Sequence, residues 1–462
     1  MNNDLDLIVI GGGPAGYVAA LRAAQIGKKV AVIEEDKLGG VCSNWGCIPT
    51  KALLKTAELL ESCRRADSFG LEISGLKFDY AKVIARSRQS ATRMSSGVEY
   101  LFKSRGIRWI KARAKINKEK KIRVFYPAEK TEELHSPFIL ICTGCKPKTI
   151  PSIKVDGKII FTSREALEST RLPKKIVIVG GGAIGIEFAY FYRCLGSEVV
   201  VVEMTSHILP GTDIEISQAL HKSLTKKGIT IFNSTLVEKC WVIKDKLHVR
   251  LKGAVNDSIE SDAMLLAIGV AAQPSEILEP GLELKTENGF ISVDNKYQTS
   301  IEGIYAAGDV IGPPLLAHAA FREGWEAVDC MFLGKQSTRP HFVPSCVYCQ
   351  PQVATVGMTE EEAKKENIPY KTAKYPYNAN GKAVAAGETE GFVKLIVSSR
   401  DEEILGAHIL GQDASELIGE FVLAKTLEST AQELHLAIHP HPTLSEMIGE
   451  VALLVEGIGL HL

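Results

Sequence analysis

The chain opens a predicted βαβ unit with the stretch Leu5-Asp6-Leu7-Ile8-Val9-Ile10-Gly11-Gly12-Gly13-Pro14-Ala15-Gly16. A short apolar run leads into closely spaced glycines, and residues 17–27 and 30–34 then have the patterns of a helix and a second strand. Gly11, Gly13 and Gly16 permit the tight turn, the approach of the backbone to a pyrophosphate, and close packing of helix on strand. The stretch therefore predicts a dinucleotide-binding fold.

The same arrangement recurs near the middle of the chain. Its parts are the apolar run 175–179, the glycines Gly180, Gly182 and Gly185, a helix to residue 195 and an apolar run over residues 198–203. In both copies an acidic residue, Glu34 or Glu203, lies 23 positions after the first glycine (34 − 11 and 203 − 180), where its carboxylate can accept hydrogen bonds from an adenosine ribose. A single fingerprint can be a structural turn, but two in full context predict two adenine dinucleotides.

The composition limits the possible partners. With 462 residues, 45% of them hydrophobic, the chain is long enough for about three domains. A formal net charge of −1 and the lack of long Lys or Arg runs favour a small-molecule or protein substrate over nucleic acid or a membrane surface. The N-terminus has no basic segment, and its apolar run stops at Gly11, so we expect a cytoplasmic protein without a signal or membrane-spanning segment.

Two of the ten cysteines, Cys42 and Cys47, lie just beyond the first fingerprint with four residues between them. This spacing is at the wide limit for a zinc hairpin, and no second ligand pair is close, whereas Gly46 between them can bend the chain enough for a disulfide. Pro49 is well placed to begin a helix whose N-terminal amides favour a thiolate. The pattern indicates thiol–disulfide exchange; the alternative is a pair of buried structural cysteines.

Four other cysteines imitate a zinc site. Cys142 and Cys145 form one C-x-x-C pair and Cys346 and Cys349 another, but about 200 residues separate the pairs, far more than in a zinc module. We therefore expect no metal. Domain boundaries are expected near residues 147–151 and 340–344, and the last third of the chain alternates apolar strands with an acidic helix over residues 414–427.

These motifs are followed by Gly303-Ile304-Tyr305-Ala306-Ala307-Gly308-Asp309 and His439-Pro440-His441-Pro442-Thr443-Leu444-Ser445-Glu446. Together they resemble the flavin-linked pyridine nucleotide disulfide oxidoreductases, and among these the dihydrolipoamide dehydrogenases most closely. The resemblance implies an α/β fold with two Rossmann-like domains and a C-terminal α+β dimerisation domain. Residues 1–148 and 271–340 would carry FAD, residues 149–270 NAD, and residues 341–462 the dimer interface, so that each active site uses two chains.

The resemblance also assigns roles to individual residues. Cys42 and Cys47 would form the redox disulfide, Cys42 facing the substrate and Cys47 the flavin. His441, rather than its neighbour His439, would be the base, and Glu446 would hold its ring. FAD would contact Gly11, Gly13, Gly16, Glu34, Lys51, Thr143, Gly144, Asp309, Leu316, Ala317 and His318. NAD would contact Gly180, Gly182, Gly185, Glu187, Glu203 and Gly269. Lys51 and Glu187 would pair near the flavin, or form an ordinary salt bridge.

The expected reaction is oxidation of protein-bound dihydrolipoyl groups with NAD⁺ as acceptor. Glu203 with no arginine nearby favours NAD over NADP, against glutathione-type and trypanothione-type reductases. No cysteine follows Cys349, against mercuric and large thioredoxin reductases with a C-terminal redox tail. The expected partners are a second copy of the chain and lipoyl domains of 2-oxoacid dehydrogenase complexes or the glycine cleavage H protein. The alternatives are an NADH-dependent reductase of another small disulfide and a mainly structural subunit.

Overall fold

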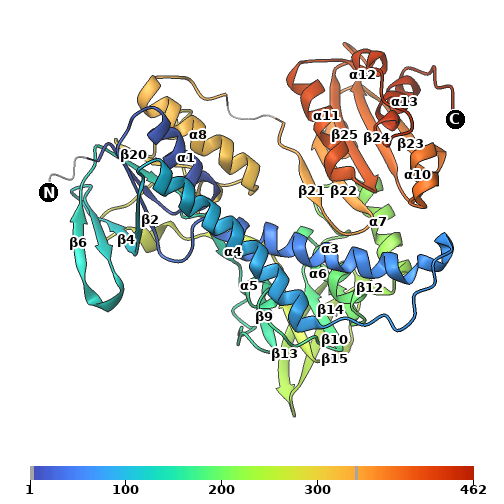
Figure 1. Cartoon of the computed structure of the whole chain (residues 1–462), viewed down its shortest axis with the longest axis horizontal. Coiled ribbons are helices and arrows are strands. Elements are labelled where there is room, and N and C mark those ends of the chain that lie inside the picture. The colour runs from blue at the N-terminus through green and yellow to red at the C-terminus, as the bar shows by residue number, and fades with distance from the viewer. Residues whose placement is uncertain (1–4, 339–341, 462) are drawn as a thin grey trace.

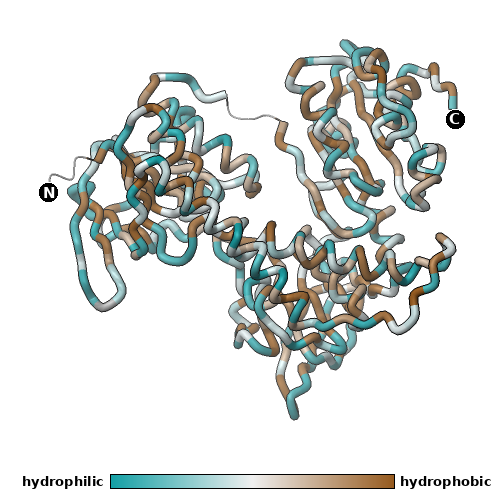
Figure 2. Tube along the Cα trace, in the orientation of Figure 1, coloured by the Kyte–Doolittle hydropathy of each residue, from teal (hydrophilic) through white to brown (hydrophobic). Residues whose placement is uncertain are grey.

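The computed structural model describes residues 5–338 and 342–461 (Figure 1). The expected boundary at residues 340–344 thus falls partly outside the described residues. Within them, the chain builds three units, each around its own five-stranded sheet. Figure 1 shows the first unit at the left, the second below the centre and the C-terminal unit at the upper right. Hydrophobic segments run through the inside of each unit in Figure 2, because apolar side chains are removed from water there.

The first unit contains a parallel sheet with the order β20-β7-β1-β2-β3. Its strands are β1 (Leu7–Ile10), β2 (Val30–Glu34), β3 (Arg108–Lys111), β7 (Phe138–Ile141) and β20 (Ile304–Ala306). One face packs against α1 (Pro14–Gln25) and α8 (Ala317–Leu333). The other face packs against the antiparallel strands β4 (Arg113–Ile116), β5 (Ile122–Phe125) and β6 (Thr131–Leu134). Cover on both faces explains why the inner strands are apolar throughout.

The second unit repeats this design with a parallel sheet in the order β12-β11-β10-β16-β9. Its strands are β9 (Ile160–Thr162), β10 (Lys175–Val179), β11 (Glu198–Val202), β12 (Ile229–Phe232) and β16 (Ala263–Leu266). Its helices are α5 (Ser163–Ala166), α6 (Ala183–Cys194) and α7 (Ile214–Lys226). An antiparallel sheet of β13 (Thr235–Ile243), β14 (Lys246–Gly253) and β15 (Ser258–Ser261) covers one face of the parallel sheet. Both predicted βαβ units are therefore present.

The C-terminal unit is an antiparallel sheet in the order β21-β22-β25-β24-β23. Its strands are β21 (Ser345–Val347), β22 (Gln352–Gly357), β23 (Tyr370–Pro376), β24 (Phe392–Ser398) and β25 (Ile404–Gly411). Its helices are α9 (Glu360–Lys365), α10 (Gly381–Ala386), α11 (Ala414–Thr426), α12 (Ala431–Leu436) and α13 (Glu446–Val455). Helices α11 and α13 pack on the sheet around a buried core. The predicted fold class, two Rossmann-like units followed by an α+β unit, is confirmed.

The segment after β2 connects the first two units. It contains α2 (Gly40–Trp45), α3 (Cys47–Arg64) and α4 (Tyr80–Ser104). Near its C-terminal end, α3 contacts the second unit: the Tyr190 hydroxyl donates to Glu61 at 2.7 Å, Lys227 pairs with the same carboxylate, and Arg64 donates to the Cys194 carbonyl at 2.6 Å. The remaining strands are β8 (Cys145–Pro147), β17 (Val270–Ala272), β18 (Thr286–Glu287) and β19 (Phe290–Ile291).

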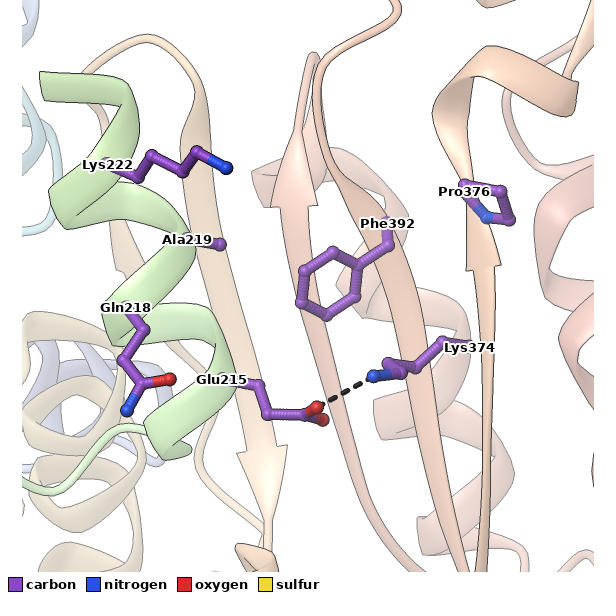
Figure 3. A pocket seen from close by; sticks show the side chains of 7 residues that line it. All are labelled: Glu215, Gln218, Ala219, Lys222, Lys374, Pro376 and Phe392. Carbon is purple, nitrogen blue, oxygen red and sulfur yellow. Dashed lines mark hydrogen bonds and ion pairs between the residues drawn. The ribbon is translucent and has the colours of Figure 1, made fainter. Parts of the chain in front are cut away.

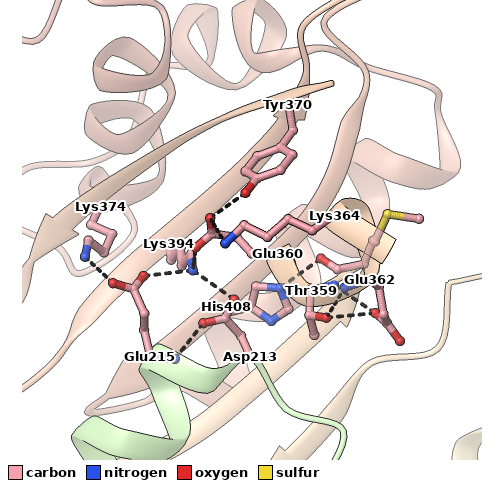
Figure 4. Close-up of polar contacts among 11 residues, drawn as sticks. Asp213, Glu215, Thr359, Glu360, Glu362, Lys364, Tyr370, Lys374, Lys394 and His408 are labelled. Carbon is pink, nitrogen blue, oxygen red and sulfur yellow. Dashed lines mark hydrogen bonds and ion pairs between the residues drawn. The ribbon is translucent and has the colours of Figure 1, made fainter. Parts of the chain in front are cut away.

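A buried ion cluster joins the second unit to the C-terminal sheet (Figure 4). Lys394 on β24 is fully buried, and its ammonium lies 2.8 Å from Asp213 and 2.8 Å from Glu215 at the start of α7. It also pairs with Glu360 on α9. Burial alone would lower the pKa of Lys394, but the hydrogen bonds to these carboxylates raise it. The cation therefore stays charged and holds the two units together.

A groove of about 610 Å³ runs beside this cluster (Figure 3). It is lined by Glu215, Gln218, Ala219 and Lys222 from α7 and by Lys374, Pro376 and Phe392 from the C-terminal sheet. Lys374 bridges it through an ion pair with Glu215 at 2.7 Å. The residues that line this groove include none of those predicted for the site, so the groove marks a seam between units.

Replacing Lys394 with Met should destabilise the protein strongly. The variant leaves Asp213 and Glu360 without their buried cation, a defect that costs about 3–5 kcal/mol. Lys374→Met removes an ion pair whose lysine is half exposed and should cost less than about 1 kcal/mol. Urea-induced unfolding followed by circular dichroism measures both losses. An equal decrease in the free energy of unfolding in the two variants would contradict a greater contribution of the buried cluster to stability.

Candidate redox site

The two predicted redox cysteines lie on consecutive helices. Cys42 is in α2, Cys47 is the first residue of α3, and Gly46 between them is the N-cap of α3. Both are half-buried free thiols, and they lie close enough for each side chain to shift the pKa of the other. The short break at Gly46 therefore brings together two sulfurs that a continuous helix would hold apart.

The two thiols have opposite pKa shifts. The hydrogen bond from Cys42, followed by the charge of Lys51, lowers the pKa of Cys47 to about 7 although burial opposes the shift. The same hydrogen bond and burial raise the pKa of Cys42. In the reduced state Cys47 is therefore the more acidic of the two thiols: above about pH 7 it is mainly the thiolate, whereas Cys42 keeps its proton.

Lys51 and Glu187 form an ion pair one turn beyond Cys47. The Lys51 ammonium lies 2.9 Å from both oxygens of the buried Glu187 carboxylate on α6. The Tyr348 amide of the C-terminal unit donates to the same carboxylate at 3.0 Å, and the Tyr348 ring centroid is 4.4 Å from the ammonium. The pairing that the resemblance implied is present, and all three units meet at it.

Helix α4 holds the redox segment along its length, a feature that sequence reasoning missed. Three of its side chains donate to backbone carbonyls: Ser87 to Pro49 at 2.9 Å, Arg88 to Asn44 at 2.7 Å and Ser95 to Leu38 at 2.8 Å. These bonds satisfy carbonyls on both sides of the cysteine pair. No local pattern in the sequence indicates them, because the partners lie 38, 44 and 57 positions apart.

His441 and Glu446 are hydrogen-bonded as expected. His441 Nδ1 lies 2.8 Å from Glu446 Oε1, and the Thr443 amide donates to the other carboxylate oxygen at 2.9 Å. Burial acts to raise the pKa of Glu446, but the Thr443 amide and His441 outweigh burial, and the net shift is downward. The carboxylate is therefore charged and fixes the orientation of the imidazole ring. No described residue bonds to His441 Nε2, which is left available.

The two histidines of the His-Pro-His motif differ in how deeply they are buried. His439 is 11% exposed and is held by Glu420 of α11 at 2.7 Å, whereas His441 is 79% exposed. Glu420, on the acidic helix predicted over residues 414–427, thus has a partner. No described hydrogen bond or ion pair joins His441 to Cys42 or Cys47, and the neighbouring helices α12 and α13 lie in the outer part of the C-terminal unit in Figure 1.

The residues predicted for the first dinucleotide gather at the carboxyl edge of the first sheet. A Cβ atom at Gly16 would lie 1.9 Å from the Gly11 carbonyl, so glycine is required there. Gly13 caps α1, and a Cβ on it would meet only one atom, at 3.7 Å, so space remains for a pyrophosphate. Glu34 accepts the Gly12 and Asp36 amides at 2.8 Å each. The turn fits a dinucleotide.

Three other predicted segments reach the same edge. Thr143 and Gly144 follow β7, Asp309 follows β20, and these strands are neighbours in the sheet. Leu316 caps α8, which begins at Ala317, and the His318 ring lies 2.8 Å from the Pro344 carbonyl. Burial raises the pKa of Asp309, and no described side chain donates to its carboxylate. Such an acceptor suits hydroxyl donors of a cofactor.

The second unit has an equivalent turn. A Cβ at Gly185 would lie 1.9 Å from the Gly180 carbonyl, whereas a Cβ at Gly182 would meet nothing within 4 Å. Glu203 accepts the Gly181 amide at 2.5 Å and the Thr205 amide at 2.7 Å. Gly269 follows β16 at the same edge, with φ +94° and open space around it. This turn also fits a dinucleotide.

The other paired cysteines are thiols of raised pKa. Burial raises the pKa of Cys145 to about 12 and that of Cys346 to about 11, and it raises the pKa of Cys142 and Cys349 as well. Among the residues that the structure describes, no three His, Cys, Asp or Glu side chains gather as metal ligands. In the same ranges, no helix combines the length and the apolar character needed to cross a membrane.

Fold and site define a class of two-dinucleotide oxidoreductases with a redox-active cysteine pair. The model of the pyridine nucleotide-disulphide oxidoreductase family matches residues 5–324, and that of the family's dimerisation domain matches residues 343–452. The chain belongs to the pyridine nucleotide-disulphide oxidoreductases.

Several full-length relatives of the chain share one name. A dihydrolipoyl dehydrogenase from Rhizobium etli is 41% identical, with 98% of each chain covered. Proteins of the same name from Zymomonas mobilis and Bacillus subtilis are each 40% identical over 100% of both chains. Among solved structures, LpdA from Mycobacterium tuberculosis superposes with a TM-score of 0.90 at 28% identity, covering 97% of this chain and 99% of LpdA. The HOCl-induced flavoprotein disulfide reductase RclA from Escherichia coli, solved as a Cu(II) complex, has a TM-score of 0.88 at 27% identity, covering 98% and 100%.

In the reduced protein, alkylation of Cys47 should follow a titration with its midpoint at about pH 7. A lowered pKa means that the reactive thiolate is present above this midpoint and is lost below it. Lys51→Met removes a cation that favours the thiolate, so the midpoint should move upward. Iodoacetamide labelling at a series of pH values, with peptide mass spectrometry, measures it, and Cys349 is the unreactive internal control. A midpoint unchanged in Lys51→Met would contradict the role of this cation.

Proposed function

We propose that this chain is a dihydrolipoyl dehydrogenase that oxidises protein-bound dihydrolipoyl groups and reduces NAD⁺. The observation that carries the proposal is the Cys42–Cys47 pair, which lies one turn from the Lys51–Glu187 ion pair. The chain also has two dinucleotide-binding turns, one before the pair and one after it in the sequence. The relatives of that name, about 40% identical over the full length, support this choice of substrate.

Residues 1–148 and 271–340 are proposed to hold FAD, and residues 149–270 to hold NAD. In the first unit, Glu34 would accept from the adenosine ribose and Asp309 from the hydroxyls nearer the flavin. In the second, Glu203 would accept from the NAD ribose, and its buried charge would repel the 2′-phosphate of NADP. When bound, the two cofactors supply electron transfer from the dithiol and hydride transfer to NAD⁺.

The cysteine pair exchanges its disulfide with the substrate dithiol. One substrate thiolate attacks Cys42 Sγ, the Cys42–Cys47 bond breaks, and Cys47 leaves as a thiolate. Its low pKa makes it the better leaving group. The second substrate thiol then attacks the mixed disulfide and releases Cys42. The substrate is thereby oxidised to its disulfide and the protein is reduced by two electrons.

His441 is proposed to accept a proton from the substrate dithiol in this exchange. Glu446 orients its ring through Nδ1, so the free Nε2 is the basic atom. His441 is exposed, and no described hydrogen bond or ion pair joins it to the cysteine pair of its own chain. The site is therefore proposed to form in a homodimer, with residues 341–462 as the interface. The other proposed partners are lipoyl domains of 2-oxoacid dehydrogenase complexes or the glycine cleavage H protein, in the cytoplasm.

The flavin-loaded protein should reduce NAD⁺ with dihydrolipoamide, and Cys47→Ser should abolish this activity. His441→Gln should lower kcat about 10²- to 10⁴-fold, the usual contribution of a general base. Absorbance of NADH measures the reaction. Reduction of glutathione disulfide by NADH, without dihydrolipoamide activity, would favour a reductase of another disulfide, as the likeness to RclA allows. A flavin-loaded dimer inactive in both assays would favour a structural subunit.

Mixed dimers should show that each site uses two chains. Cys47→Ser and His441→Gln homodimers are each inactive, but a dimer with one chain of each kind has one site with both groups intact. Random association of the two variants makes about half of the dimers mixed, so activity should recover to about one quarter of wild type. Differently tagged, co-expressed chains allow this measurement. No recovery in purified mixed dimers would place both groups in one chain.

A further inference from the structure

Trp45 lies between the two redox cysteines and is only 8% exposed. Its indole N–H donates to Asp36 Oδ2 at 2.8 Å. The Asp36 amide in turn donates to Glu34 at 2.8 Å, the acidic residue that closes the first fingerprint. A continuous set of bonds therefore leads from the first dinucleotide-binding turn to the helix that carries Cys42.

Three cations surround the Trp45 ring. The Arg164 guanidinium lies 3.9 Å from the ring centroid, that of Arg88 4.4 Å and the Lys37 ammonium 5.1 Å. Tryptophan offers the best aromatic face for a cation, and a nearly buried ring strengthens the attraction. We call Asp36, Lys37, Trp45, Arg88 and Arg164 the Trp45 clamp.

The members of the clamp come from different parts of the fold. Arg164 belongs to α5 of the second unit and also donates to Asp36 at 2.9 Å. Arg88 belongs to α4 and also donates to the Asn44 carbonyl at 2.7 Å. Two planar guanidinium groups thus combine a stacking contact with a hydrogen bond, which lysine cannot do in the same way. The clamp therefore connects α2 to the first unit through Asp36 and to the second unit through Arg164.

Helix α2 depends on such external support. It has six residues and no side-chain N-cap, and it is bounded by Gly39 with φ +89° and by Gly46. So short a helix with flexible ends is not stable by itself. Its only cysteine, Cys42, donates the hydrogen bond that contributes most to the lowered pKa of Cys47. The position of α2 therefore sets where the Cys42 sulfur lies relative to Cys47.

We propose that Trp45 is a positioning residue for the redox pair, and that Arg164 stacks on it so that the second unit helps to hold Cys42 against Cys47. This role in disulfide exchange rests on the proposed function. Trp45 and Arg164 touch neither substrate nor sulfur in this role; they act through the placement of α2. Loosening α2 weakens the bond between the two thiols, so Cys47 becomes less acidic and the exchange slows.

The test compares Trp45→Leu, Arg164→Met and the double variant, each reduced and flavin-loaded. The first should raise the alkylation midpoint of Cys47 by about one pH unit, a tenfold loss of thiolate below the midpoint. It should lower kcat for dihydrolipoamide about 10- to 100-fold with KM within about twofold. Arg164→Met should give smaller changes in the same direction, and adding it to Trp45→Leu should change nothing further, because the two residues act as one unit.

Trp325→Leu is the matched control. Trp325 lies on α8, the Arg22 guanidinium of α1 lies 4.3 Å from its ring centroid, and neither residue belongs to the Trp45 clamp. A midpoint in Trp45→Leu and Arg164→Met equal to that of Trp325→Leu would overturn the proposal, as would strictly additive effects. If Trp45→Leu fails to fold, Arg164→Met decides alone, since its side chain is half exposed. The alkylation midpoint needs no dihydrolipoyl substrate, so it tests positioning even if wild type lacks that activity.

Discussion

The ion pair of Lys51 with Glu187 is the contact on which the rest of the site depends. Glu187 is almost fully buried, and a buried carboxylate is tolerated only when cations or N–H groups satisfy its charge. Here the ammonium comes from the first unit and the amide of Tyr348 from the C-terminal unit. Charge satisfaction therefore requires all three units to meet at one point, and that point lies one helical turn from Cys47.

The two long helices near this ion pair, α3 and α4, make different contacts. Helix α3 begins in the first unit at Cys47 and ends against the second unit, where Glu61 and Arg64 make their polar contacts. Helix α4 lies beside it and satisfies backbone carbonyls on both sides of the cysteine pair. The reactive segment is short and rich in glycine, so its geometry is imposed by its neighbours more than by its own helix propensity.

Local patterns in the sequence were enough to predict the two dinucleotide-binding units. Strand β10 covers the predicted residues 175–179, and Gly16 and Gly185 stand where any side chain would strike a carbonyl. The partners of Trp45 could not be found this way, because Arg164 is 119 positions from it (164 − 45) and nothing local marks the contact. The choice between His439 and His441 rested on resemblance, since only tertiary packing shows which ring is held by Glu420 and which is exposed.

Among the ten cysteines, Cys47 stands apart, because its pKa is lowered whereas the pKa values of Cys42 and of several buried cysteines are raised. Thiol–disulfide exchange requires a thiolate that a partner can reach. Burial keeps Cys142, Cys194 and Cys349 protonated by raising their pKa, and it also shields them from other thiols. Cys47 is also largely enclosed, but Cys42 and Lys51 reverse the effect of burial on its pKa. The low pKa of Cys47 thus depends on the neighbouring Cys42 thiol and on one cation placed beside a single sulfur.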